Sequence, residues 1–257
     1  MEAHSKFIAQ ILCIVVIFSL EHIWPFFDQK RARITHATRN LSLAAINGIL
    51  GILFFSALMV ALMQWSAEHE FGLLYWFSLT GISRFIVAFL LFDLWMYAWH
   101  VLNHVVPFFW RFHKVHHSET KMDVTTGLRF HPVEITLSFF TRFFILALLG
   151  LRFQELLLYE TALQLVILFH HSNVALPERF DKVLRLVIVS PNMHRVHHSE
   201  IQAETDSNFS SIFSFWDRLF KTFCFRSDIE NIRYGLKEIR SEKSQTVLGM
   251  LRTPWRF

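Results

Sequence analysis

The histidines of this chain are the residues whose type and spacing point most directly to chemistry. The sequence contains 15 of them in 257 residues. Histidines three and four residues apart share one face of a helix, where they lie close enough to bind a common metal site. Two near-identical stretches, HKVHHSE at 113–119 and HRVHHSE at 194–200, predict two half-sites that converge on one centre. Together with an i, i+4 pair, the clustered histidines are His100, His104, His113, His116, His117, His194, His197 and His198.

These clusters predict a dimetal site. Imidazole nitrogen suits iron, zinc, copper or nickel, and eight imidazoles exceed the coordination number of a single ion. The Glu-x-x-His motif of soluble di-iron bundles and the His-Glu-x-x-His zinc motif are both absent from the sequence. We therefore expect a histidine-rich site that is nearly free of carboxylates.

Other polar residues lie near these clusters in the sequence. Asp93 falls on the same helical stripe as His100 and His104, so we expect it to accept a hydrogen bond from a ligating histidine. The alternative is that Asp93 pairs with Arg84 or with an interfacial water. One ring of the 170–171 histidine pair is expected to reach the metal centre, whereas His131, which precedes a proline, is expected to be structural.

Apolar segments must position these histidines. The stretch 41–67 contains no charged residue over 27 positions, which predicts a membrane-spanning helix. A first span is expected within 7–27, retained as an anchor and not cleaved as a signal peptide. The segments 71–99, 135–151 and 156–169 are apolar apart from single charges, which tend to face a protein interior. We expect four to five membrane-embedded helices; a soluble all-α protein is the alternative.

Charge distribution predicts the orientation. Lys and Arg follow the first and third spans, and the last 40 residues carry nine of them against four Asp and Glu. These segments are therefore expected to be cytoplasmic, together with most of the histidines. The positive-inside bias also accounts for the net charge of +4, and no pattern indicates nucleic-acid binding. Two cysteines exclude a disulfide scaffold.

The motifs together resemble one known superfamily, the membrane-bound fatty acid hydroxylase/sterol desaturase group. The resemblance covers 93–222, about half of the chain, and departs from the usual pattern at Val101 and Gly127. The motifs that carry it are D-x3-Y-x2-H-x3-H from 93, W-x2-H-x2-H-H-S from 110, TTGLRFHP-x-E from 125, HSN from 171, P-x2-HRVHHS from 191 and NF-x6-WDRLF from 208.

The resemblance implies an all-α fold: a multi-pass membrane helical bundle with a cytosolic histidine-rich cap that holds a dimetal centre. It implies two Fe ions and the O2-dependent hydroxylation or desaturation of a lipid substrate. This lipid would be a sterol, a fatty acyl chain or a related molecule. Asn208 is expected near the ligands or a bound water. The expected domains are N-terminal transmembrane helices at 1–70, a catalytic domain at 71–222 and a basic cytosolic tail at 223–257. The implied ligands are His100, His104, His113, His116, His117, His171, His194, His197 and His198.

Such a site needs an external electron donor, because the chain lacks a G-x-G-x-x-G nucleotide motif. We expect a small acidic redox protein, a ferredoxin or a protein like cytochrome b5, on a basic face formed by Arg111, Lys114, Arg195, Arg218 and Lys221. A bacterial inner membrane is favoured over the endoplasmic reticulum. The alternatives are an alkylglycerol or carotenoid-type monooxygenase and a non-enzymatic haem- or metal-binding membrane protein.

Overall fold

The computed structural model of the chain describes residues 2–28 and 33–256, and all regular elements in this part are helices. The all-α prediction is therefore confirmed. Lys30 and Arg31, which contribute to the predicted charge asymmetry, lie outside the described residues. The longer helices are α1 (Glu2–Ile23), α2 (Arg33–Leu50), α3 (Ser56–Glu68), α5 (Gly81–Val105), α6 (Pro107–His117), α7 (Pro132–Leu149) and α8 (Phe153–His170). The shorter ones are α4 (Leu73–Trp76), α9 (Glu178–Leu184), α10 (Pro191–His197), α11 (Gln202–Thr205), α12 (Phe215–Leu219) and α13 (Val247–Arg252).

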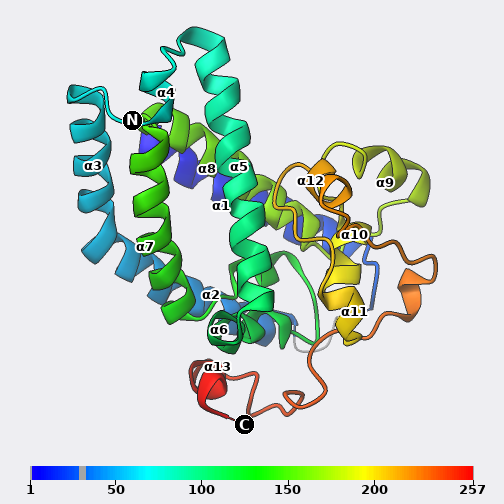
Figure 1. Cartoon of the computed structure of the whole chain (residues 1–257). Coiled ribbons are helices and arrows are strands. Elements are labelled where there is room, and N and C mark those ends of the chain that lie inside the picture. Colours follow the sequence, from blue (N-terminus) through cyan, green and yellow to red (C-terminus); the bar gives the residue numbers. More distant parts are fainter. Residues whose placement is uncertain (1, 29–32, 257) are drawn as a thin grey trace.

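Three stretches in the described part of the chain are long and apolar enough to cross a bilayer. They are Arg33–Trp76, Gly81–Val105 and Pro132–Leu149. The apolar stretch Gln10–Ile23 of α1 is shorter, and α1 packs along α8. In Figure 1, α3, α7 and α5 stand side by side, and the C-terminal segment lies beyond the end of the bundle where α2 and α6 meet. The chain is thus an integral membrane protein with several apolar helices.

The predicted span 41–67 is a bent helix and not a straight one. A π-helical turn at Gly51–Phe55 separates α2 from α3, and the chain changes direction there (Figure 1). A π turn inserts an extra residue into the helical ladder and is a common cause of such a kink. The bend lets α3 pack on α7 while α2 passes beneath the bundle toward α13 and the 3₁₀ turn Val124–Leu128.

The charges within the apolar segments face the protein interior, as predicted. Arg84 is 1% exposed and its Nε donates to Glu155 at 2.7 Å. Arg142 donates to Glu160 at 2.5 Å across α7 and α8. A charge inside a membrane segment is costly unless it is paired or faces a cavity. Both arginines are therefore stabilised by a partner on α8.

Prolines begin the helices that carry the two H-x-x-H-H motifs. Pro107 and Pro191 occupy the first helical positions of α6 and α10. A backbone N–H at this position has no partner within the helix, so proline, which lacks the N–H, costs no hydrogen bond there. The Ser190 hydroxyl also accepts from the Met193 N–H and so caps α10. These starts set the register in which the histidines of both motifs face inward.

Candidate metal centre

The structure brings the nine histidines predicted as ligands into two neighbouring groups. Within each group, one nitrogen from every ring lies within 4.8 Å of the others. The groups draw on α5, α6, the C-terminal end of α8, and α10, so elements far apart in the sequence meet at one point. The five-histidine group comprises His100, His104, His113, His117 and His197, and the four-histidine group comprises His116, His171, His194 and His198.

Backbone carbonyls orient two rings of the five-histidine group. The Nδ1 of His100 lies 2.8 Å from the Phe209 carbonyl, and the Nδ1 of His197 lies 2.6 Å from the Ser207 carbonyl. Because a carbonyl oxygen only accepts, each Nδ1 carries the proton and donates it. The Nε2 of each ring is buried and has no hydrogen-bond partner. Each therefore presents a lone pair to the interior, as a metal ligand does.

Carboxylates orient two further rings of the same group. The Nδ1 of His113 lies 2.7 Å from Glu134, and the Nδ1 of His104 lies 3.3 Å from Asp206. The Nε2 atoms of both histidines are again buried without a partner. Both groups consist of histidines alone, as predicted, and the two carboxylates contact the outer Nδ1 atoms of the rings. Neither residue was singled out from the sequence, although Glu134 closes the HP-x-E motif three positions after His131.

The four-histidine group has a donor set whose spacing fits a cation. The Nε2 atoms of His116 and His171 are 3.1 Å apart, those of His171 and His194 are 3.0 Å apart, and those of His194 and His198 are 3.2 Å apart. The Nδ1 atoms of His116 and His171 each face a backbone carbonyl and carry the proton, so their Nε2 atoms are lone pairs when the rings are neutral. Lone pairs at this distance repel unless a cation lies between them. The donor set therefore fits a metal ion.

Burial keeps these imidazoles neutral, as a metal ligand must be. Desolvation and the neighbouring rings lower the pKa of His116, His194 and His198 well below the usual histidine value. Desolvation lowers the pKa of His197 to about 3, although the Ser207 carbonyl opposes this shift. Near neutral pH the rings are therefore available to bind a metal without first losing a proton.

Replacing Glu134 with glutamine is expected to weaken metal binding by the five-histidine group about 10- to 100-fold, because an outer hydrogen-bond partner orients a ligand and raises its basicity. Glutamine keeps the shape but removes the charge that faces His113. Competition with a chelator on the purified protein measures this affinity. Glu178→Gln, at an ion pair outside the groups, is the control. Equal affinity in both variants would show that Glu134 does not act on the ligand.

Two predicted neighbours of the ligands have other partners. Asp93 accepts hydrogen bonds from the Tyr159 hydroxyl at 2.8 Å and the Trp216 indole at 2.9 Å, and not from a histidine or from Arg84. It therefore ties α5 to α8 and to α12. The Asn208 amide donates to the carbonyls of Met193 and Cys224. Asn208 thus connects α10 to the segment after α12 through backbone carbonyls, and its expected place beside the ligands or a bound water stays a prediction.

Two further histidines and one residue predicted at the surface have defined contacts. His131 caps α7, since its Nδ1 accepts from the Val133 N–H, which agrees with a structural role. His170 is buried with its ring 4.0 Å from that of His194, but it belongs to neither group. Arg195 is only 1% exposed and donates to the carbonyls of Ser172 and Val174. Arg195 is therefore not part of an exposed basic face, because its guanidinium is used inside the protein.

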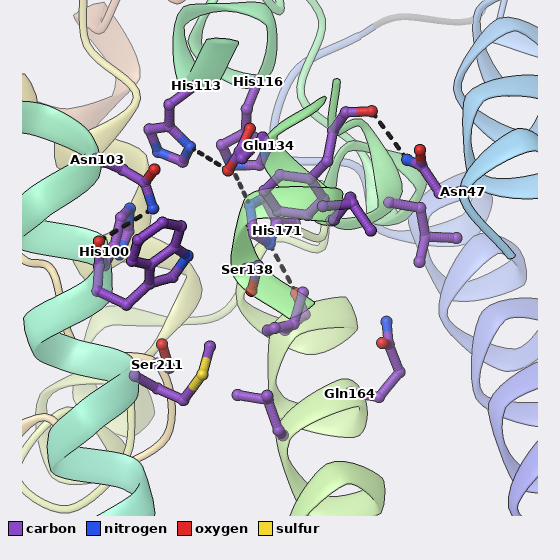
Figure 2. A pocket seen from close by; sticks show the side chains of 18 of the residues that line it. Asn47, His100, Asn103, His113, His116, Glu134, Ser138, Gln164, His171 and Ser211 are labelled. Carbon is purple, nitrogen blue, oxygen red and sulfur yellow. Dashed lines mark hydrogen bonds and ion pairs between the residues drawn. The ribbon is translucent and has the colours of Figure 1, made fainter. Parts of the chain in front are cut away.

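A cavity of about 290 Å³ leads from the histidines into the helical bundle. His100, His113, His116, His171 and His194 contribute to its wall. Figure 2 shows His113 and His116 at one end and Gln164 and Ser211 toward the other. Much of the remaining wall is apolar, formed by residues such as Leu163, Ile167 and Phe139. The arrangement suits an elongated apolar molecule whose end approaches the histidines.

The chain is similar to known lipid-modifying proteins. It is 26% identical to human alkylglycerol monooxygenase over 86% of this chain and 48% of that protein. It is 31% identical to the ornithine lipid hydroxylase OlsE of Rhizobium tropici over 50% of this chain and 38% of that protein. It is 30% identical to mouse cholesterol 25-hydroxylase over 55% of this chain and 47% of that protein. The chain thus spans half or less of the length of these relatives, and no solved structure matches it.

The sequence model of the family described as "Fatty acid hydroxylase" matches residues 85–222. This region holds more than half of the chain and includes all nine grouped histidines. The predicted resemblance is confirmed, and the chain belongs to the fatty acid hydroxylase family.

Proposed function

We propose that the two histidine groups hold two iron ions and that the chain is an O2-dependent lipid hydroxylase. The observation that carries this proposal is the convergence of nine buried imidazoles in two adjacent groups at the end of an apolar cavity. Two irons bound here would supply the oxidising chemistry that attacks a lipid C–H bond. In this proposal His100, His104, His113, His117 and His197 hold one ion, and His116, His171, His194 and His198 hold the other.

The chain's own residues would orient the ligand rings, bind the lipid and shield the reacting carbon from water. The carbonyls of Phe209 and Ser207 and the carboxylate of Glu134 fix three ligand rings, so that the ligand geometry exists before the substrate arrives. The buried walls exclude water from the reacting carbon, which protects reactive species from side reactions. The cavity directs one end of an apolar molecule toward the histidines.

Hydroxylation is favoured over desaturation. Each of the three relatives is named as a hydroxylase or a monooxygenase. The lipids in their names are an alkylglycerol, an ornithine lipid and cholesterol. Their shared feature is a lipid substrate. A haem protein is disfavoured, since haem takes two axial ligands and would leave most of these nine imidazoles without a function.

The proposed reaction needs electrons from a separate protein. We place a small acidic ferredoxin or a protein like cytochrome b5 near the histidine end of the bundle, facing the cytoplasm. Lys221 is exposed there and Lys114 is half-buried, so both remain available for charge complementarity. We further propose that 71–222 is the catalytic region, that 1–70 supplies anchoring helices, and that the membrane is a bacterial inner membrane.

Lipid analysis under ¹⁸O2 tests the proposed function. Cells that express the chain are expected to accumulate a lipid that carries one ¹⁸O atom in a new hydroxyl group, and cells with the empty vector are not. Mass spectrometry of total lipid extracts measures the label. A lipid that has lost two hydrogens without gaining label would identify a desaturase instead, and unchanged lipids in the presence of a competent electron donor would refute both activities.

A further inference from the structure

A pair of oppositely charged residues lines the cavity within the helical bundle. Arg142 on α7 and Glu160 on α8 both line it, and their side chains are 18% and 23% exposed. Both lie within apolar helices, where an ionisable residue that faces a cavity marks a functional site more often than a structural one. Gln164 follows Glu160 by four residues on the same face of α8 and points into the cavity in Figure 2.

The hydrogen bonds of Arg142 are incomplete. One guanidinium nitrogen donates to Glu160, and another meets only the sulfur of Met96, a weak acceptor, at 3.3 Å. The Nε is buried and has no partner. A buried donor without an acceptor is unfavourable, so an oxygen atom that enters this end of the cavity gains a hydrogen bond that the protein itself does not supply.

The helices bound the distance between the two ends. Arg142 lies ten residues after the start of α7 at Pro132, and Glu160 lies ten residues before His170, so their backbones are about 15 Å along each helix from the histidine end. The Arg142 guanidinium contacts Met96, which lies four residues, or about 6 Å along α5, before His100. A molecule with an oxygen at Arg142 therefore presents a carbon roughly 6 to 15 Å away to the proposed metal centre.

We propose that Arg142 and Glu160 form a subsite for a neutral hydroxyl group at the end of the lipid substrate opposite to the oxidised carbon. A hydroxyl both donates and accepts, so it can accept from Arg142 and donate to Glu160. The ion pair is neutral overall, and a carboxylate or phosphate would leave an uncompensated negative charge in the bundle. The substrate class is thus an elongated apolar alcohol, either a sterol or a long-chain fatty alcohol. This inference rests on the proposed function for the reacting end of the molecule.

Equilibrium binding of tritiated 1-hexadecanol to the full chain in nanodiscs tests the subsite. Because the assay needs neither iron nor an electron donor, it separates this inference from the proposed enzymatic activity. We expect 1-hexadecanol or cholesterol to displace the probe at least about tenfold better than hexadecane, which has no hydroxyl. Stronger displacement by cholesterol identifies the sterol as the favoured form, and stronger displacement by 1-hexadecanol identifies the fatty alcohol. Equal displacement by the alcohols and hexadecane, or the strongest displacement by hexadecanoate, would overturn the inference.

The double variant Arg142→Leu/Glu160→Leu removes the pair without leaving a single buried charge. We expect it to lose about 10- to 100-fold in affinity for 1-hexadecanol and to lose its preference over hexadecane. The matched control is Arg84→Met/Glu155→Met, because this second ion pair between α5 and α8 does not line the cavity. A retained preference in the Arg142 variant would contradict the proposal. The hexadecane comparison on the unaltered protein decides the question if the variant does not fold.

Discussion

His116→Ala and His197→Ala are each expected to abolish lipid oxidation and to lower the iron content of the purified protein. His116 belongs to the four-histidine group and His197 to the five-histidine group, so each variant removes one ligand from a different proposed ion. Replacing a residue that only orients a ligand already weakens metal binding about 10- to 100-fold, so loss of the ligand itself should exceed that. Product formation by mass spectrometry and iron per chain measure the two effects.

The control for these variants is His69→Ala, since His69 is exposed and belongs to neither group. It should keep both the activity and the iron content of the unaltered protein. An active His116→Ala or His197→Ala protein with its full iron content would remove that histidine from the ligand set.

Arg129→Met is expected to destabilise the protein by about 3 to 5 kcal/mol, because it deletes one partner of a buried ion pair. Arg129 is 1% exposed and its guanidinium donates to five groups. One of them is Glu119, which lies 3.5 Å away and is equally buried. Another is Gln245 in the C-terminal tail, at 2.7 Å. The residue therefore joins α6, the carrier of one histidine motif, to the tail.

Thermal unfolding in detergent measures this effect. At about 2 to 4 °C per kcal/mol for a chain of this size, the expected fall in the midpoint is roughly 6 to 20 °C. Arg39→Met is the matched control, because Arg39 pairs at 3.3 Å with Glu242, whose side chain is 84% exposed. Surface pairs contribute about 0 to 1 kcal/mol. Similar midpoints for both variants would show that the Arg129 network does not hold the tail to the site.

Local spacing in the sequence was enough to predict an all-helical chain and the histidines that the structure brings together, but it predicted four to five membrane-embedded helices where the described residues contain three candidate spans. An H-x-x-H-H motif places its rings on one face whatever the rest of the chain does, because i, i+3 and i, i+4 neighbours are set by the helix itself. The uncharged run 41–67 likewise predicts a long apolar helix by composition alone. The distribution of the rings between two groups depends on how α5, α6, α8 and α10 pack, and no spacing within one helix contains that information.

The residues behind the ligands were harder to predict for the same reason. Glu134 reaches His113 only because α7 starts beside α6, and Asp93 turns to Tyr159 and Trp216 because α12 folds back onto α5. Arg195 is a basic residue that the sequence predicted at the surface, yet it is buried and donates to the carbonyls of Ser172 and Val174. Each of these contacts joins segments far apart in the sequence, so it follows from the tertiary fold and not from a local pattern.

The iron stoichiometry of the purified protein tests the central claim most directly. Iron and polypeptide are quantified in the same sample for the unaltered chain and for His104→Ala/His117→Ala, which removes two ligands from the five-histidine group. Because nine imidazoles exceed the coordination number of one ion, we predict about two irons per unaltered chain and about one in the double variant. One iron or none in the unaltered chain, after reconstitution with excess ferrous iron, would contradict a centre built on two metal ions.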